Sequence, residues 1–426
     1  MVRLNEQKHS TENKPLERFP APVKVYIPLS QHLGKICNPL VNIKDQVSLG
    51  QKIASVEAHV YAPIHASVSG KVIAIQEWPH PVLGRCKTIV IENDGLDMGS
   101  GEQGTRESVE VNRLTAQQIR DIVLEAGVVG MGGASFPTHI KLNPQKPLDT
   151  LIINGAECEP YLTCDYRLMV EKTQEIVKGI ELAVKCVGAK KVIIAIEDNK
   201  PDAIKAFNYG LRVTDYELRI LKSAYPQGGE KQLIKNVLGK EVTSGKLPFD
   251  VGVVVHNVGT IHAIYEAVYL KKPLYERAVT VAGSCISNPK NLLVRIGTPI
   301  RELVDSCGPL KEIPSKVIIG GPMMGIAQFS EMVPVIKSST GVLLLNSRET
   351  REIEEESCIR CGACVRECPV GLMPTLINLS SQKEMWPQTK KFGALDCIEC
   401  GICSYVCPSN IRLIQSIKRA KLEVLK

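Results

Sequence analysis

The sequence predicts a multidomain protein in which β modules flank an α/β domain and a cysteine-rich segment closes the chain. Three observations carry this prediction. The chain has 426 residues, enough for about three domains of ordinary size. The spacing of its apolar residues changes along the chain, from strand-like alternation to a regular exchange of strand and helix patterns and back. Two cysteine runs of identical spacing lie near the C-terminal end.

Composition excludes several classes of protein. The net charge of +7 is modest and aromatic residues make up 4%, so neither disorder nor a nucleic-acid partner is indicated. No segment approaches the ~18 uninterrupted apolar residues of a membrane span, and the N-terminal residues lack the apolar core of a secretory signal. We therefore expect a cytosolic chain. In that compartment, 15 cysteines indicate metal binding rather than disulfides.

A compact all-β module is expected directly after a polar lead, residues 1–22. Residues 23–95 alternate apolar and polar positions between turn signals, which is typical of short antiparallel strands. The turns at 50–51 and 69–72 resemble the biotinyl/lipoyl type of barrel-sandwich hybrid. Carriers of that fold modify a lysine at a hairpin tip, but residues 57–61 contain none. A docking or structural role is therefore favoured over a swinging arm.

An α/β domain is predicted next, over residues 113–274, after a Gly-, Ser- and Glu-rich linker at 96–112. Strand and helix patterns alternate, and the strands are almost continuously apolar, which indicates a Rossmann-like parallel sheet covered on both faces. The expected strands are 151–154, 191–197, 217–222 and 251–256. The expected helices are 115–124, 168–186, one from 201, 230–238 and 260–270. Ligands of such folds bind at the carboxyl ends of the strands.

Two segments complete the chain. Residues 275–345 show short strands with Gly and Pro turns, so a small β-rich domain is expected there. Residues 346–426 contain a charged stretch at 348–356, predicted as a helix, then the cysteine runs and a C-terminal amphipathic helix. We expect this last helix to pack on the cysteine-rich domain; docking of its basic face on a partner or an anionic membrane is the alternative.

Both cysteine runs have the spacing C-x2-C-x2-C-x3-C-P, which is typical of proteins with two 4Fe-4S clusters. Three cysteines of each run bind one cluster, and the fourth binds the other cluster. The predicted ligands of the first cluster are Cys358, Cys361, Cys364 and Cys407. Those of the second are Cys368, Cys397, Cys400 and Cys403. Gly362 and Gly401 permit the close backbone approach that the loops require.

Zinc is the alternative, because four cysteines also satisfy a tetrahedral zinc ion. Zinc modules usually place a dozen or more residues between their cysteine pairs, whereas here every gap is two or three residues and the motif occurs twice. The spacing therefore favours iron–sulfur clusters. The remaining seven cysteines have no ligand spacing, and most of them are expected to be buried apolar thiols.

A second candidate site is expected where predicted strands end. Residues 130–138 form a Gly-rich stretch with Lys141 after it, a pattern that fits a phosphate but equally an ordinary turn. Residues 154–165 follow a strand and carry three carboxylates, which suit sugar hydroxyls and the edge of a flavin or nicotinamide. Residues 228–231 and 257–260 each open a helix, whose free N–H groups attract phosphate, although Thr260 is equally explained as a helix cap.

These four stretches together resemble the NADH- and FMN-binding flavoprotein subunit of respiratory complex I. With the β module before them, a domain similar to the SLBB β-grasp fold behind them and two ferredoxin-type runs, the chain resembles the C subunits of the Rnf ion-translocating ferredoxin:NAD oxidoreductases. The resemblance implies noncovalent FMN at the matching positions Gly130, Gly132, Gly133, Lys141, Asn154, Glu157, Asn257 and Thr260. For NAD(H), it implies Phe136, Glu159 and Glu230.

The function that the resemblance implies is electron transfer between NAD(H), FMN and two 4Fe-4S clusters, in a subunit on the cytoplasmic side of the cell membrane. The flavin carries the chemistry, so no catalytic side chain is expected. Implied partners are the ferredoxin-like B subunit and the membrane subunits. The alternative is a soluble relative, either a cobalamin reductase or an electron donor to an amino-acid reductase. Two departures from the family pattern are Ser135, where complex I has glycine, and the N-terminal residues 7–10.

Overall fold

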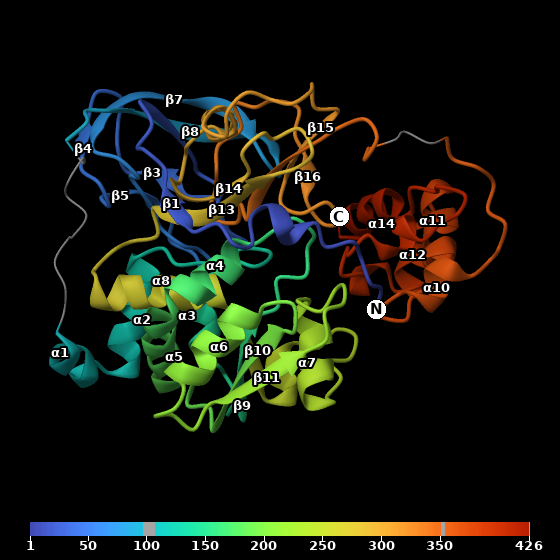
Figure 1. The fold of residues 1–426 in the computed structure, drawn as a ribbon, viewed down its shortest axis with the longest axis horizontal. Helices are drawn as coiled ribbons and strands as arrows, with labels where there is room; N and C mark the ends of the chain where they lie inside the picture. The colour runs from blue at the N-terminus through green and yellow to red at the C-terminus, as the bar shows by residue number, and fades with distance from the viewer. Residues whose placement is uncertain (97–106, 351–353, 426) are drawn as a thin grey trace.

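The computed structural model describes residues 1–96, 107–350 and 354–425. Two β modules lie side by side above an α/β domain, and a small helical domain with the cysteine runs lies beside them (Figure 1). The N-terminus of the chain lies close to this helical domain. The predicted multidomain β and α/β architecture is therefore confirmed in outline.

The first module is all-β, as predicted. One antiparallel sheet has the order β2-β8-β7-β4, and a second has the order β3-β5-β6. The strands are β2 Lys24–Pro28, β3 Asn38–Pro39, β4 Gln46–Val47, β5 Lys52–Ser55, β6 Ile64–His65, β7 Gly70–His80 and β8 Gly84–Asn93. Alternate residues such as Val25 and Ile27 on β2 are fully buried in the core of this module. The period of two in the sequence therefore selects the buried face.

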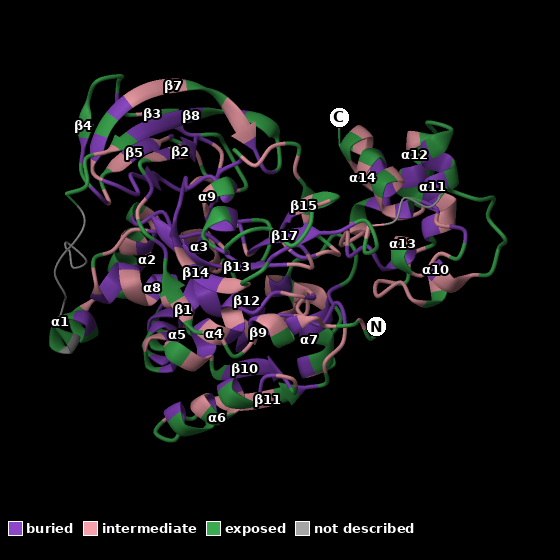
Figure 2. Cartoon of the chain, turned by 45° about the horizontal axis from the view of Figure 1, so that its top comes forward, coloured by how far each residue is buried: buried purple, intermediate pink, exposed green. Residues whose placement is uncertain are grey.

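The α/β domain is built on a four-stranded sheet in which every neighbouring pair is parallel. The order is β11-β10-β9-β12, with β9 Thr150–Gly155, β10 Lys191–Glu197, β11 Glu217–Leu221 and β12 Val253–Asn257. On β9, Leu151 and Ile153 belong to one core and Ile152 to another on the opposite face. Both faces are buried, as Figure 2 shows for β9 and β12, which explains the continuous apolar strands.

Helices cover both faces of this sheet. The larger core takes residues from α2 Ala116–Glu125, α4 Cys164–Glu171, α5 Thr173–Val187, α6 Pro201–Gly210 and α8 Val258–Tyr269. The other core takes residues from α7 Glu230–Leu238. Two short helices, α1 Ser108–Arg113 and α3 Thr138–Lys141, and the 3-10 turn η2 Pro248–Val251 complete the domain.

Two expectations for this region were wrong. The single helix expected at 168–186 is two helices, α4 and α5, separated at Lys172, whose backbone is not helical. The helix α4 begins earlier than expected because the Glu157 carboxylate accepts hydrogen bonds from amides in its first turn. The segment expected as a linker contains α1 at its end, while its residues 97–106 lie outside the described part of the chain.

The third sheet is six-stranded and has the order β1-β14-β13-β17-β15-β16. Its strands are β1 Leu16–Arg18, β13 Glu276–Ala282, β14 Lys290–Arg295, β15 Lys316–Ile319, β16 Ile326–Ala327 and β17 Gly341–Leu345, accompanied by helix α9 Ile300–Asp305. The strand β1 comes from the N-terminal lead and pairs in parallel with β14. The lead therefore connects modules that are far apart in sequence.

The C-terminal domain is helical. Its elements are α10 Ala363–Arg366, α11 Pro374–Gln382, α12 Trp386–Lys391, η3 Ala394–Asp396, α13 Ile402–Tyr405 and α14 Leu413–Val424. The helix α14 buries Leu413 and Ile417 against this domain, so the packing role expected for it is confirmed. The helix expected at 348–356 is absent from residues 348–350 and 354–356; residues 351–353 are not described. None of the described helices is long and apolar enough to cross a bilayer.

Lys337, in the second β-rich module, binds backbone carbonyls of the first β module and the α/β domain. Its side chain is 1% exposed, and Nζ donates to the carbonyls of Pro63, at 2.7 Å, and Gly127, at 2.6 Å. In Lys337→Met both buried carbonyls lose their donor, at a cost of about 1–3 kcal/mol each. We expect a lower midpoint of thermal unfolding. The exposed Lys316→Met is the control and should unfold like the wild type; equal midpoints for both variants would contradict the role of Lys337.

Candidate functional site

Two asparagines at the carboxyl edge of the parallel sheet position the surrounding loops. Asn154 on β9 lies opposite Asn257 on β12. The Asn154 side chain donates to Gly228 O, at 2.9 Å, and accepts from Ala156 N, at 3.0 Å. Asn257 Oδ1 accepts from the amides of Gly259, at 2.8 Å, and Thr260, at 3.3 Å, and so caps helix α8. This edge is where the fold class places ligands.

The Gly-rich loop packs against the start of α8. Thr260 Oγ1 accepts a hydrogen bond from Met131 N, at 2.9 Å, so Thr260 anchors the loop while Asn257 caps the helix. A Cβ atom on Gly132 would lie 2.9 Å from Asn257 Nδ2, whereas one on Gly133 would meet nothing within 4 Å. Gly132 and Gly133 are exposed. The loop therefore has one closely packed side and one open side.

Lys141 and Glu230, predicted for different ligands, form an ion pair. Lys141 Nζ lies 2.5 Å from Glu230 Oε1 and 3.1 Å from Val255 O. Glu230 is the first residue of α7, and Gly229 before it has no side chain to cap the helix. The first turn of α7 thus already holds an anion, the Glu230 carboxylate, which suits the positive end of the helix and pairs with Lys141.

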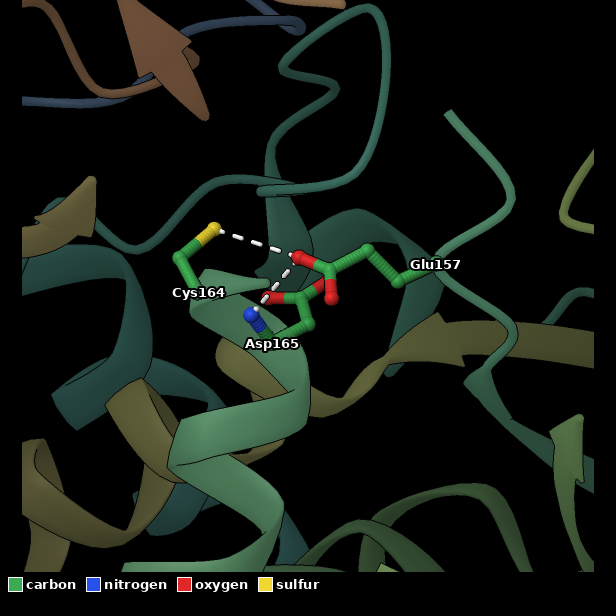
Figure 3. Close-up of side chains that lie close together, drawn as sticks. All are labelled: Glu157, Cys164 and Asp165. Carbon is green, nitrogen blue, oxygen red and sulfur yellow. Dashed lines mark hydrogen bonds between the residues drawn. The ribbon is translucent and has the colours of Figure 1, made fainter. Parts of the chain in front are cut away.

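Glu157 is at the centre of a buried hydrogen-bonded group with Cys164 and Asp165 (Figure 3). Its Oε1 accepts from the Asp165 amide, at 2.9 Å, and from the Cys164 thiol, at 3.5 Å. Asn257 Nδ2 donates to Asp165 Oδ2, at 2.7 Å. Burial, followed by the Glu157 charge, raises the pKa of the Cys164 thiol well above its usual value. These protein partners account for the group without a metal ion.

Asp165 supplies a prediction on pH dependence. Burial, with the Glu157 charge beside it, raises the pKa of Asp165 from 3.8 to about 6. The folded state therefore binds more protons than the unfolded state between these two values, so its stability falls as the pH rises through this window. We expect flavin-free Asp165→Asn to be more stable than the wild type above pH ~7, with the difference shrinking toward pH ~4, measured by urea unfolding.

The control for this prediction is Asp215→Asn, because Asp215 is exposed. It should leave the stability curve unchanged at every pH. A constant destabilisation of Asp165→Asn across the whole range would contradict the prediction, because it would mean that the hydrogen bond from Asn257 outweighs the cost of burying the charge.

The three residues predicted for NAD(H) have different surroundings. The Glu159 carboxylate accepts from the amides of Met323, at 3.1 Å, and Met324, at 2.9 Å, which lie between β15 and β16. Its Oε1 also lies 3.3 Å from the Tyr225 hydroxyl, whose shorter hydrogen bond goes to Cys400 O. Phe136 is half-buried in the Gly-rich loop. Among the described contacts, no hydrogen bond or ion pair joins Phe136, Glu159 and Glu230, so their assignment stays a prediction.

Lys8 positions the loop that carries the carboxylates, and sequence reasoning missed this role. Its side chain is buried, and Nζ donates to three carbonyls of the 157–162 loop: Glu157 at 2.8 Å, Glu159 at 2.8 Å and Leu162 at 2.5 Å. Burial lowers the pKa of Lys8, with the Glu157 charge opposing the shift. The N-terminal lead thus fixes the loop that carries the carboxylates, and the residues around Lys8 gave no motif that announces this.

One group of four cysteines, the inner site, consists of Cys368, Cys397, Cys400 and Cys403. All four line a single cavity, together with apolar side chains such as Ile398 and Ile417. Burial raises the pKa of the Cys400 thiol to about 11 and that of Cys403 to about 12, and each also feels the charge of Cys368. Cys368, which belongs to the first run, therefore lies next to the three cysteines of the second run.

The outer site consists of Cys358, Cys361, Cys364 and Cys407. Burial raises the pKa of Cys364, and the charges of Cys407 and Cys358 act on it, so here too the fourth cysteine comes from the other run. Cys358 and Cys361 are exposed. The crossed grouping expected from the sequence matches these neighbours, and we retain it as the proposed ligand assignment.

The spacing of the cysteines fits a group larger than a zinc ion. Among the described residues, which include all eight, no three cysteine sulfurs lie within 4.8 Å of one another. Ligands of a tetrahedral zinc ion, with Zn–S near 2.3 Å, would have to lie about 3.8 Å apart. The loops also repeat in backbone conformation, because Arg360 and Gly362 have positive φ and so do the equivalent Glu399 and Gly401.

The seven remaining cysteines bear out the expectation of buried thiols. Six of them are buried and Cys158 is partly buried. Fold and site together define the class of the protein: a parallel α/β domain with a Gly-rich loop at its carboxyl edge, joined to a domain with two four-cysteine sites that suit iron–sulfur clusters.

Comparison with protein families assigns each module. A Nuo51 FMN-binding domain matches residues 123–266 and an RnfC barrel sandwich hybrid domain matches 2–96. An SLBB domain matches 278–327 and a 4Fe-4S dicluster domain matches 357–411. These matches confirm the expected order of modules and the expected cofactors, FMN and 4Fe-4S clusters.

Curated relatives identify the family. The C subunit of the proton-translocating ferredoxin:NAD(+) oxidoreductase complex of Clostridium ljungdahlii is 46% identical over 99% of this chain and 93% of its own length. The corresponding subunit of the Na(+)-translocating complex of Acetobacterium woodii is 46% identical over 98% of this chain and 95% of its own length. The C subunit of an ion-translocating oxidoreductase complex of Rhodobacter capsulatus is 44% identical over 99% of this chain and 82% of its own length. The chain belongs to the RnfC family of ion-translocating oxidoreductase subunits.

The fold is also found in a solved structure. An NAD+-reducing [NiFe]-hydrogenase in the H2-reduced state superposes with a TM-score of 0.50 and 19% sequence identity, over 76% of this chain and 63% of the hydrogenase chain. At this identity the likeness concerns the fold alone.

Proposed function

We propose that this chain is the peripheral electron-input subunit of a membrane-bound, ion-translocating ferredoxin:NAD oxidoreductase complex. One observation carries the proposal: a complex I-type flavin domain lies in direct contact with a domain that holds two four-cysteine sites, in a chain 46% identical to the C subunit of such a complex. The proposal includes the domain limits that we expect from the sequence. It also includes the individual cofactor-binding residues named there.

The proposed flavin site combines the residues at the carboxyl edge of the sheet. Gly130, Gly132 and Gly133 let the backbone approach the ligand. The amides at the start of α7 and Lys141, which pairs with Glu230 in this structure, are the proposed contacts of its phosphate. Glu157 and Asn257 enter the proposal as residues that position the site, because their polar atoms are engaged by protein partners in one hydrogen-bonded network. When bound, FMN exchanges two electrons with NAD(H) and one electron at a time with a 4Fe-4S cluster.

The protein's own contribution is to position these groups and exclude water. No side chain is needed as an acid or base for hydride transfer, and we propose none. The inner site is placed for contact with the flavin domain, since Tyr225 and Gln232 donate to its backbone. The outer site has two exposed cysteines and is the proposed side for exchange with a partner. In this proposal, electrons pass between the flavin and the inner cluster, and between the outer cluster and the partner.

The proposed partners are the membrane subunits and the ferredoxin-like B subunit of the complex. This part of the proposal rests on the names of the relatives, each of which is a subunit of a multi-subunit complex. Attachment to the cytoplasmic side of the membrane would then come from these partners. The finding that no described helix is long and apolar enough to cross a bilayer is compatible with attachment of this kind.

The test is anaerobic purification of the full chain, alone and co-expressed with its membrane subunits. We expect about eight irons per chain for two clusters, one extractable FMN, and recovery of the chain in the detergent-extracted complex. Stoichiometric zinc instead of iron would overturn the cofactor assignment. A chain that never joins the membrane subunits but rapidly reduces cob(III)alamin would overturn the complex assignment in favour of the soluble alternative.

A further inference from the structure

The inner site is held from outside its own domain. Tyr225, which lies between β11 and α7, has one hydroxyl hydrogen and two acceptors within reach, the carbonyl oxygen of Cys400 at 2.9 Å and Glu159 Oε1 at 3.3 Å. The shorter hydrogen bond is the one to Cys400 O. Gln232 on α7 donates from Nε2 to the carbonyl oxygen of Pro369, at 3.0 Å. Tyr225 is 1% exposed and Gln232 is 7% exposed. Two buried side chains of the flavin domain thus bind backbone groups adjacent to two of the proposed ligands, Cys400 and Cys368.

Each of these hydrogen bonds fixes the direction of an amide. In a trans peptide the C=O and the following N–H point in opposite directions. A carbonyl of Cys400 that is held toward Tyr225 therefore turns the N–H of Gly401 away from Tyr225. In the same way, the carbonyl of Pro369 turns the N–H of Val370 away from Gln232. Gly401 and Val370 both line the cavity between the four cysteines of the inner site.

The repeat of the two cysteine runs gives an internal comparison. The residue equivalent to Cys400 is Cys361, and its carbonyl accepts from Arg366 Nη1, at 2.8 Å, within the same domain. The residue equivalent to Arg366 is Tyr405, which is 59% exposed. At the outer site the domain therefore supplies its own donor, whereas at the inner site the flavin domain supplies it through Tyr225.

We propose that Tyr225 and Gln232 are positioning residues that set the reduction potential of the inner cluster by aiming the amides of Gly401 and Val370 at it. Hydrogen bonds to the sulfurs are one of the determinants of cluster potential, and each stabilises the more negative, reduced state. The flavin domain thereby tunes the cluster that it contacts and leaves the outer cluster to its own domain. The inference rests on the ligand assignment in the proposed function.

The test is a redox titration of the anaerobic full chain, followed by low-temperature EPR. The signal of the inner cluster is identified by its loss in Cys368→Ser. In Tyr225→Phe and in Gln232→Leu we expect the equilibrium constant for reduction of the inner cluster to fall roughly tenfold, a shift of about 59 mV to more negative potential. The potential of the outer cluster should stay at its wild-type value. Tyr405→Phe, a loss of the equivalent exposed hydroxyl, should change neither potential.

Two outcomes would overturn the inference. Wild-type potentials for the inner cluster in both Tyr225→Phe and Gln232→Leu would show that these donors do not orient its amides. Equal shifts of both clusters would show a general loosening of the domain instead. A wild-type protein without two clusters would be a different failure, since it would refute the proposed function itself. Tyr225 and Gln232 lie on different elements. The same shift in both Tyr225→Phe and Gln232→Leu would therefore not come from a folding defect at one position.

Discussion

Replacement of Cys368 by serine is expected to remove the inner cluster and to spare the outer one, although Cys368 belongs to the first cysteine run. The reason is the crossed grouping: the Cys368 thiol lies with Cys397, Cys400 and Cys403 around one cavity. Loss of one of four thiolates deprives a 4Fe-4S cluster of a ligand. The iron content should fall from about eight to about four per chain, measured together with low-temperature EPR.

The matched variant is Cys407→Ser, the equivalent change in the second run. It should remove the outer cluster, whose proposed ligands are Cys358, Cys361 and Cys364. The pair of variants gives opposite EPR losses if the ligands cross, because each fourth cysteine then serves the other run. If Cys368→Ser instead removes the signal that depends on Cys358, each run binds its own cluster and the crossed assignment is wrong.

The second large effect is expected at Gly132. A Cβ atom at this position would lie 2.9 Å from Asn257 Nδ2 and 3.1 Å from Asn257 Cβ, so Gly132→Ala must displace the side chain that caps α8. Loss of this cap lowers the free energy of unfolding by about 0.5–2 kcal/mol. We expect FMN to bind roughly tenfold more weakly while both clusters are retained, measured by flavin titration of the apoprotein and by iron content.

Gly133→Ala is the informative neighbour, because a Cβ there meets no protein atom within 4 Å. It should leave the stability of the flavin-free protein at the wild-type value, whereas Gly132→Ala lowers it. A weaker FMN affinity in Gly133→Ala would then report close approach of the ligand to the open side of the loop. Full FMN affinity in Gly132→Ala would show that the position of Asn257 does not matter to the site.

Much of the fold could be predicted because the local pattern alone determines it. The period of two around Val25 and Ile27 and the continuous apolar run of β9 each specify one kind of sheet. Thr115 and Gln118 form the capping box that starts α2 where the sequence places it. The early start of α4 was missed because its cause is distant: Glu157, seven residues before the helix, supplies the carboxylate that binds first-turn amides.

The site could be predicted in its residue types but not in its contacts. The glycines, Asn257 and the cysteines stand in motifs that can be read from spacing. Lys8, Tyr225 and Lys337 stand in none, and each acts across modules through backbone carbonyls of segments far away in the sequence. A hydrogen bond to a carbonyl needs no particular acceptor residue, so the partner leaves no mark in the sequence. Thr260 illustrates the same limit, since its hydroxyl binds Met131 N rather than capping its own helix.

A single-turnover experiment shows whether this one chain connects NAD(H) to both clusters. The purified chain, with FMN and clusters, is photoreduced, freed of reductant and mixed anaerobically with excess NAD+. We expect NADH to form in an amount that matches the stored electrons, at two electrons per NADH, and both cluster signals to reoxidise. FMN-free protein should do neither. Clusters that stay reduced beside NAD+ in the flavin-loaded chain would show that the chain does not connect NAD(H) to them.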